Sequence, residues 1–171
     1  MSLSIRDGLS ADLRGIQAIY AREVLHGCAS FEEIPPSIED MRVRMDDIQA
    51  QGFPYLVAVV DGALAGFAYA NRYRFRPAYR YTLENAIYVD PSHRRCGVGR
   101  ALLGALIDGC TDARQLISVI GDSANEASIQ LHQSLGFSHV GTLNSVGFKH
   151  GRWLDSVLMQ RPLNGGDTHP P

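Results

Sequence analysis

Residues 84 to 106 of this 171-residue chain read ENAIYVDPSHRRCGVGRALLGAL, and they place a strand, a glycine-rich turn and a helix in immediate succession. Residues 84–90 are rich in β-branched and aromatic side chains, and Pro91 cannot donate to a sheet ladder, so we expect the strand to end there. Beyond the turn, apolar residues recur at helical spacing, at Leu102, Leu103, Leu106 and Ile107. The helix is therefore predicted to begin at Gly97 and Gly99.

A glycine turn that opens a helix directs free backbone N–H groups to one point, with the positive end of the helix dipole behind them. Such a turn binds phosphate, and Arg94, Arg95 and Arg100 add positive charge beside it. The two glycines could instead serve only the close packing of a helix on a sheet. The turn fits neither a Walker loop, which needs Gly-Lys-Ser/Thr, nor the three-glycine dinucleotide fingerprint.

Composition indicates one globular domain with a net charge close to zero. The chain is 45% apolar, and its 16 basic and 18 acidic residues give a net charge of −2. This balance offers no general electrostatic reason to bind nucleic acid or an anionic membrane. We expect a single domain over residues 1–163 and a flexible tail over residues 164–171, which are polar and rich in glycine and proline.

No apolar leader opens the sequence and no apolar run has the length that spans a bilayer, so we expect a cytoplasmic protein without a membrane partner. Three widely spaced cysteines (Cys28, Cys96 and Cys110) suit neither a disulfide framework nor a zinc site. We therefore expect free thiols and no metal. Cys96 lies inside the turn, where a reactive thiol is a less favoured interpretation than a turn filler.

The remaining patterns predict the element order β-α-α-β-β-β-α-β-α-β-β. Alternating or continuous apolar runs indicate strands at residues 3–6, 55–60, 63–70, 84–90, 115–120, 137–148 and 152–160. Capping residues and helical spacing indicate helices from Ser10 or Asp12 to near Gly27, from Ser37 to about Ala50, from Gly97 onward, and from the loop 122–125 to Gly136. The fold class is α/β (α+β): a mixed, mostly antiparallel sheet of about seven strands with about four helices on both faces.

Residues 71–81 have the most unusual composition, because arginines at 72, 74, 76 and 80 alternate with aromatic residues. One interpretation is a strand with a solvated basic edge. A second is a stacking platform for nucleic acid, which the near-neutral net charge disfavours. A third is a set of guanidinium groups that hold an anionic substrate beside Glu84. Phe31, in the loop before Pro35-Pro36, is either an anchor on the core or the wall of a substrate pocket.

Three motifs together resemble the GNAT superfamily of N-acetyltransferases across nearly the whole chain. They are the element order, the turn Arg94-x-x-Gly97-x-Gly99, and the segment Asn125-x-x-Ser128-x-x-x-His132-x-x-x-Gly136-Phe137. Further segments resemble the phosphinothricin and methionine sulfoximine/sulfone acetyltransferases within it: Phe31-Glu-x-x-Pro35, Thr82-x-Glu84-x-x-x-Tyr88-Val89 and Gly147-Phe-Lys-x-Gly151-Arg-Trp-x-Asp155.

The resemblance implies an acetyl-CoA-dependent N-acetyltransferase that acts on the α-amino group of a small amino-acid-like substrate. The backbone of residues 87–89 would pair with the pantetheine amides, and the turn would wrap the pyrophosphate. The implied residues for acetyl-CoA are Ile87, Tyr88, Val89, Arg94, Arg95, Cys96, Gly97, Val98, Gly99, Arg100, Asn125 and Ser128.

Two residues are implied in catalysis. Glu84 stands at the position of the general base, which would remove a proton from the amine through a water molecule before direct attack on the thioester. From the residues alone, without the motif, a salt bridge of Glu84 with Arg74, Arg76 or Arg80 is the preferred interpretation. His132 stands where many members have a tyrosine that protonates the departing thiolate, and a structural hydrogen bond is its alternative role.

The resemblance also implies an acceptor pocket and a homodimer. The implied pocket residues are Phe31, Arg74, Phe75, Arg76, Glu84, Asn85 and Ala86. The arginines favour an anionic acceptor over a polyamine, an aminoglycoside or a protein N-terminus. A non-catalytic acyl-CoA sensor is the alternative from a different functional class, and the presence of both Glu84 and His132 argues against it.

Overall fold

Seven strands form one open sheet in the order β1-β2-β3-β4-β5-β7-β6 in the computed structural model, which describes residues 2–171. Every neighbouring pair is antiparallel except β4 and β5, which are parallel. The strands are β1 (Leu3–Asp7), β2 (Tyr55–Val60), β3 (Ala63–Arg72), β4 (Thr82–Val89), β5 (Gln115–Gly121), β6 (Ser138–Lys149) and β7 (Arg152–Pro162). The predicted element order and mixed sheet are confirmed.

Two tight turns set the registers of the hairpins. Asp61 and Gly62 both have positive φ, 48° and 86°, as expected for the primed turn predicted between β2 and β3. His150 and Gly151, at 52° and 74°, repeat this geometry between β6 and β7. A left-handed conformation at both central residues matches the twist of the flanking strands, so each hairpin closes in two residues.

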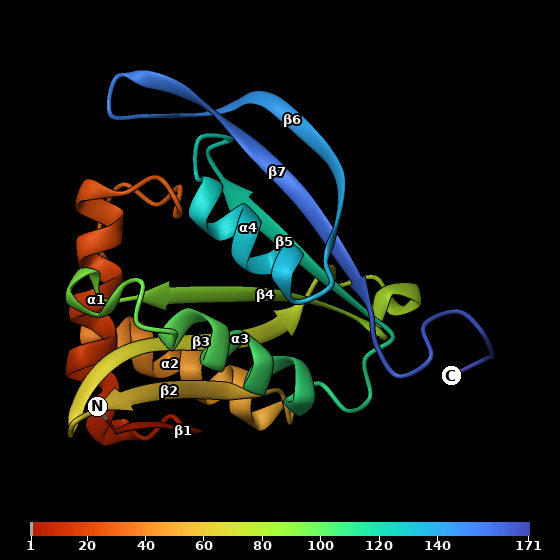
Figure 1. Cartoon of the computed structure of the whole chain (residues 1–171), viewed down its shortest axis with the longest axis horizontal. Helices are drawn as coiled ribbons and strands as arrows, with labels where there is room; N and C mark the ends of the chain where they lie inside the picture. The colour runs from red at the N-terminus through yellow and green to blue at the C-terminus, as the bar shows by residue number, and fades with distance from the viewer. Residues whose placement is uncertain (1) are drawn as a thin grey trace.

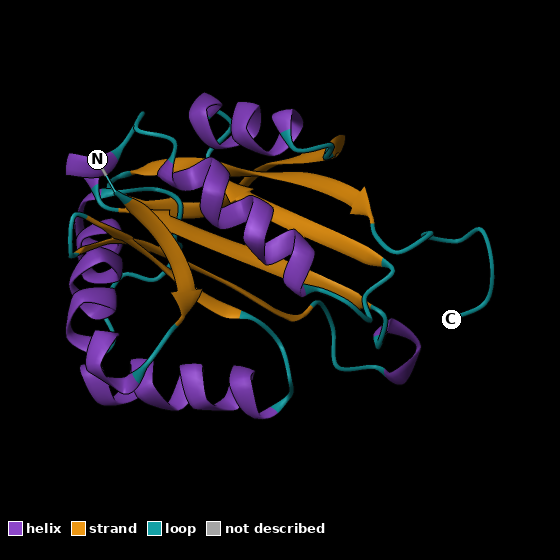
Figure 2. Ribbon diagram, turned by 60° about the horizontal axis from the view of Figure 1, so that its bottom comes forward, coloured by secondary structure: helices purple, strands orange, loops and turns teal. Residues whose placement is uncertain are grey.

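Four helices cover both faces of the sheet (Figures 1 and 2): α1 (Leu13–His26), α2 (Ile38–Ala50), α3 (Val98–Gly109) and α4 (Glu126–Ser134). One core cluster joins α1 and α2 to the sheet, and the other joins α3 and α4 to its opposite face. Ser37 caps α2 as predicted, because its hydroxyl accepts from the Asp40 amide at 3.1 Å while the Asp40 carboxylate accepts from the Ser37 amide at 2.8 Å.

The strand interpretation of the arginine-rich segment is wrong beyond Arg72. Residues 73–81 are irregular and include a short 3-10 turn over Pro77–Tyr79. Pro77 has no N–H for a ladder, and its fixed φ suits the first position of such a turn. The alternating side chains therefore lie on a loop that leads into β4, and the rings of Tyr73 and Tyr79 meet edge to face across it.

The two parallel strands stay paired over only part of their length. Their register runs from Thr82 opposite Gln115 to Asn85 opposite Ser118, whereas β4 continues to Val89 and β5 to Gly121. Figure 1 shows the two strands diverging beyond this point. On its other side β4 remains paired with β3 as far as Val89. Residues 87–89 thus keep one backbone edge that no strand of the sheet covers.

The end of the chain follows β7. The Asn164 side-chain amide donates to the carbonyls of Cys110 and Ala113, at 2.9 and 2.8 Å. The domain boundary at residue 163 and the flexibility of residues 164–171 remain predictions. Over residues 2–171, none of the helices combines the length and the apolar character needed to cross a bilayer.

Candidate active site

A cavity of about 420 Å³ lies where β4 and β5 part, and many of the predicted site residues line it. They come from the loop after α1, from β4 and from α4. Those that line the cavity are Phe31, Glu84, Asn85, Ala86, Ile87, Tyr88, Asn125, Ser128 and His132. Val89 follows on the uncovered edge of β4, while Arg74, Phe75, Arg76 and the turn at residues 94–100 lie outside the lining. The fold thus brings together residues that are far apart in sequence.

Glu84 is half-buried on β4. Burial raises the pKa of its carboxyl group, and the positive charge of Arg74 lowers that pKa in part. Within residues 2–171 the structure shows no ion pair between Glu84 and Arg74, Arg76 or Arg80, so the salt-bridge interpretation is not supported. A carboxylate with a raised pKa and no cationic partner is suited to accept a proton.

His132 is fixed in one orientation and is 1% exposed. Its Nδ1 lies 2.8 Å from the carbonyl oxygen of Ser128. A carbonyl can only accept, so Nδ1 carries the proton and Nε2 is the acceptor of a neutral ring. Burial lowers the pKa of His132, which is consistent with this neutral form.

Two further buried side chains meet His132 at Nε2. The Asn85 amide nitrogen and the Ser118 hydroxyl oxygen each lie 3.0 Å from it. Asn85 is 5% exposed and its carbonyl oxygen Oδ1 has no hydrogen-bond partner, while Ser118 is 2% exposed. Sequence reasoning missed Ser118, because a single serine in the apolar run of β5 carries no motif. Only the parallel register places it opposite Asn85.

The two glycines of the turn have different structural roles. Gly97 caps α3 with φ of +81°, which an L-residue rarely adopts, and a side chain there would meet nothing. Gly99 has ordinary φ, and its Cβ would lie 3.2 Å from Leu131, so it serves helix packing. The packing interpretation therefore applies to Gly99, and phosphate binding by the turn remains a prediction.

The turn retains the features that suit an anion. The first amide N–H groups of α3 have no partner within the helix, and Arg94, Arg95, Cys96, Gly97 and Arg100 are exposed. The Arg94 guanidinium reaches Glu23 only at 3.8 Å. Together with the uncovered edge at residues 87–89, these groups fit a long ligand with a pyrophosphate at one end and amide groups along its arm.

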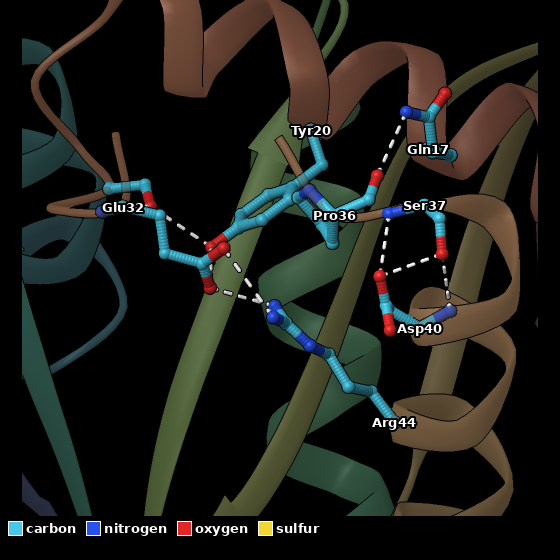
Figure 3. Close-up of polar contacts among 8 residues, drawn as sticks. Gln17, Tyr20, Glu32, Pro36, Ser37, Asp40 and Arg44 are labelled. Atoms are coloured by element: carbon cyan, nitrogen blue, oxygen red, sulfur yellow. Dashed lines mark hydrogen bonds and ion pairs between the residues drawn. The ribbon is translucent and has the colours of Figure 1, made fainter. Parts of the chain in front are cut away.

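The loop between α1 and α2 forms another wall of the cavity, and hydrogen bonds hold it (Figure 3). The Tyr20 hydroxyl donates to Glu32 Oε1 at 3.0 Å and lies 2.9 Å from the Ser30 hydroxyl. Arg44, from α2, donates to the same Glu32 oxygen at 2.7 Å. Tyr20 and Glu32 line the cavity but were not predicted as site residues, because Tyr20 belongs to an ordinary apolar helix face.

Phe31 occupies the same loop, where it is packed in place and also lines the cavity. Its ring packs on Gly121 and Gly147, which have no side chains to displace it, yet it remains 39% exposed and lines the cavity. The buried Lys149 ammonium holds the loop from behind by donating to the Ser30 carbonyl at 2.6 Å. Phe31 is therefore an anchored wall.

The arginine-rich loop stands beside the cavity. Arg74 lies over the ring of Tyr73, 4.5 Å from its centroid, and Arg74 and Arg76 are exposed. Phe75 is 90% exposed. Within this loop, Arg74 influences the cavity without lining it, because its positive charge lowers the pKa of Glu84. Contact of these three side chains with an acceptor remains a prediction.

Known proteins resemble the chain over nearly all of its length. The sequence profile of the Acetyltransferase (GNAT) family matches residues 18–137. The chain is 55% identical over 162 residues to a phosphinothricin N-acetyltransferase from Alcaligenes faecalis, covering 94% of this chain and 82% of that protein. It is 37% identical over 163 residues to an L-methionine sulfoximine/L-methionine sulfone acetyltransferase from Salmonella typhimurium, covering 95% of each.

A solved structure shares the fold closely. It is the crystal structure of a GNAT superfamily phosphinothricin acetyltransferase from Sinorhizobium meliloti in complex with acetyl-CoA, and it is 46% identical. The similarity covers 100% of this chain and 94% of that chain, with a TM-score of 0.96.

Proposed function

This chain belongs to the acetyltransferase (GNAT) family, and we propose that it moves the acetyl group of acetyl-CoA to the α-amino group of a small amino-acid-like acceptor. The acceptor is of the phosphinothricin, methionine sulfoximine or methionine sulfone type, as the names of the relatives indicate. The observation that carries the chemistry is Glu84, a half-buried carboxyl group with a raised pKa in the cavity where β4 and β5 part.

Acetyl-CoA supplies an acetyl group activated as a thioester, and three parts of the chain fit it. Arg94 to Arg100 and the start of α3 receive the pyrophosphate. The uncovered edge of Ile87, Tyr88 and Val89 pairs with the pantetheine amides as an added strand would. Asn125 and Ser128 line the cavity at the start of α4, where the Asn125 side chain accepts from the Ser128 amide.

Glu84 removes a proton from the acceptor, since an α-amino group is largely protonated near neutral pH and only the neutral amine attacks. A water molecule carries the proton to the carboxylate. The Val89 N–H donates to the oxygen that becomes negative during attack. Holding the amine against the thioester lowers the barrier by several kcal/mol, on the order expected for proximity. His132 assists the departure of the thiolate.

The acceptor lies between the Phe31 wall and the segment from Glu84 to Ala86. Arg74 and Arg76 hold its anionic groups, Phe75 contacts it, and Phe31 closes the pocket. A free-thiol assay with acetyl-CoA and a panel of amines tests the proposal. Release of thiol with phosphinothricin, methionine sulfoximine or methionine sulfone supports it. Release only with a polyamine, an aminoglycoside or a peptide would change the acceptor class. If none of the amines causes thiol release, the alternative of a non-catalytic acyl-CoA sensor is favoured.

A homodimer is the second part of the proposal. β6 is an edge strand, and exposed apolar side chains lie along the β6–β7 hairpin: Val140, Leu143, Val146, Phe148 and Trp153. Phe148 and Trp153 face each other in register, 57% and 63% exposed. A second copy would cover this apolar surface. Light scattering, which measures molar mass in solution, tests the homodimer. We expect the mass of a dimer for the parent chain and a shift towards the monomer mass for Trp153→Ser. A monomeric parent chain would refute the homodimer.

A cytoplasmic location completes the proposal, because acetyl-CoA and free amino acids are both available there. Cell fractionation in the native host measures it directly. Recovery of the chain with the cytoplasmic marker enzymes supports this location, and recovery in a membrane or exported fraction contradicts it.

A further inference from the structure

Ser118 stands at the point where the sheet opens. Asn85 and Ser118 form the last residue pair between β4 and β5. Both side chains reach the same atom, Nε2 of His132, at 3.0 Å, and all three residues line the cavity. They are almost completely buried, at 5%, 2% and 1% exposure. Buried polar groups in such a cluster normally satisfy one another completely.

At Nε2 of His132 this cluster has more hydrogen-bond donors than acceptors. His132 donates from Nδ1 to Ser128, so Nε2 offers a single lone pair, yet two donors face it. The Asn85 amide can fill that acceptor alone. The Ser118 hydroxyl proton is then free to turn into the cavity at little cost. Asn85 Oδ1 is buried and has no donor, so the hydrogen bonds of the cluster are incomplete on this side as well.

The sulfur of acetyl-CoA arrives close to Ser118, a placement that rests on the proposed function. With the pyrophosphate at Gly97, an arm paired along the free edge runs from Val89 towards Ile87. That direction leads to the point where β4 and β5 join, at Asn85 and Ser118. The reactive end of the arm is thereby delivered beside the free hydroxyl of Ser118.

We propose that Ser118 is a catalytic residue that donates a hydrogen bond to the departing sulfur, and that His132 is a positioning residue, because its Nε2 accepts from the Asn85 amide and so leaves the Ser118 hydroxyl proton free. In the reaction a carbon–nitrogen bond forms, and the carbon–sulfur bond breaks with its electron pair left on sulfur. The nitrogen loses two protons, one to Glu84 and one that neutralises the thiolate. Ser118 keeps its own proton overall, and His132 remains neutral throughout.

Ser118→Ala tests this directly because it removes the hydroxyl with little change in volume. A hydrogen bond to a charged atom is strong enough that we expect kcat to fall about tenfold or more. The affinity for acetyl-CoA should stay within about twofold. Acetyl-seleno-CoA refines the test, because a selenolate leaves more readily and needs the donor less. With it, the loss should shrink to below about threefold.

A matched control is Ser156→Ala, which removes another buried serine hydroxyl from the wall of the same cavity. Any effect of Ser156→Ala on kcat should be the same with acetyl-CoA as with acetyl-seleno-CoA, because this hydroxyl does not contact the leaving atom. If Ser118→Ala also changes both rates equally, the defect is one of packing and the proposal fails. If Ser118→Ala turns over the thioester at the parent rate, the proposal fails while the proposed function stands. Absence of acetyl-CoA turnover by the parent chain would instead refute the proposed function.

Ionisation of the CoA thiol in its complex with the protein is a readout that does not depend on turnover. It is monitored through the ultraviolet absorbance of the thiolate. A donor at Ser118 stabilises the thiolate, so Ser118→Ala should move that ionisation upward by about one pH unit, equivalent to tenfold. Nitrogen chemical shifts of His132 should keep the neutral Nδ1–H form in both proteins. Should Ser118→Ala fold poorly, Ser118→Cys, a weaker donor of similar size, takes its place. An unmoved thiol ionisation overturns the proposal.

Discussion

Phe31 packs its ring directly on the bare backbone of Gly147, so that a Cβ atom at position 147 would overlap the ring. The glycine lies on β6, whereas Phe31 belongs to the loop after α1 that forms a wall of the cavity. This wall of the cavity therefore depends on a strand that contributes no side chain to the lining. This relationship gives the first prediction.

Gly147→Ala should displace Phe31 and raise the KM for the acceptor several-fold, while the affinity for acetyl-CoA stays unchanged. Overpacking of this kind commonly costs about 1–3 kcal/mol. Gly141→Ala is the matched control, because it adds the same methyl group to the same strand where nothing lies within reach. Steady-state kinetics with both substrates measure the effect. Equal KM values for the two variants would show that Phe31 does not shape the pocket.

The turn before α3 yields a second prediction from two glycines. Gly97→Ala places an L-residue at φ of +81°, which we expect to destabilise the chain by about 1 kcal/mol or more and to reduce its thermal stabilisation by acetyl-CoA. Gly104→Ala, in the interior of the same helix and in open space, should instead stabilise the chain by about 0.5–1 kcal/mol. Thermal unfolding with and without acetyl-CoA distinguishes them. A full ligand-induced shift in Gly97→Ala would remove the turn from the acetyl-CoA site.

The elements that could be predicted from the sequence are those with a strong local cause. Asp61-Gly62 specifies a two-residue turn, Ser37 caps a helix, and Gly97 marks the start of another. Residues 73–81 were harder, because alternating arginines and aromatic side chains imitate the period of a strand. A single Pro77 decides the matter, by starting a 3-10 turn.

The site was predictable only as far as motifs reach. Glu84 and His132 belong to recognisable spacings and do line one cavity. Ser118 and Tyr20 do not, since their importance arises from tertiary contacts: a parallel register in one case, and a hydrogen bond to Glu32 in the other. The pairing of His132 with Ser118 also depends on the ring's tautomer, which a neighbouring carbonyl selects.

Glu84→Gln gives a third prediction, which concerns pH. The variant keeps the shape of the side chain and removes the base, so kcat/KM should fall at neutral pH while acetyl-CoA affinity is retained. The loss should shrink as pH rises, because more of the amine is then neutral without help. A pH–rate profile of both proteins measures this. Full activity of the variant at neutral pH would exclude Glu84 as the base.

The same substitution has an opposite effect on stability. Burial raises the pKa of Glu84 in the folded chain, so the folded state binds more protons than the unfolded state between the two pKa values. The stability that this group contributes is present below the unfolded pKa, about 4.3, and is lost as pH rises through the folded pKa. Glu84→Gln should therefore unfold at a higher temperature than the parent at neutral pH, and at the same temperature in acid. A lower melting temperature at neutral pH would contradict the raised pKa.

The arginine-rich loop gives the last prediction, which separates an acceptor clamp from a solvated loop. Removing a charge-assisted contact to a bound anion costs a few kcal/mol, whereas removing an exposed arginine costs almost nothing. If the loop is a clamp, Arg74→Ala or Arg76→Ala raises the KM for methionine sulfoximine about tenfold or more, as about 1.4 kcal/mol of lost binding requires. The KM for acetyl-CoA should not change.

Arg14→Ala is the control, because Arg14 is exposed on α1, away from the cavity. Arg74→Ala carries a second signature, since the charge of Arg74 lowers the pKa of Glu84 and its removal should shift the acidic limb of kcat/KM to higher pH. Arg76→Ala should leave that limb in place. An acidic limb that moves without a change in KM would assign Arg74 to tuning the base alone. If both loop variants match Arg14→Ala for every acceptor, the anionic acceptor is refuted, and a polyamine or a peptide becomes the better candidate.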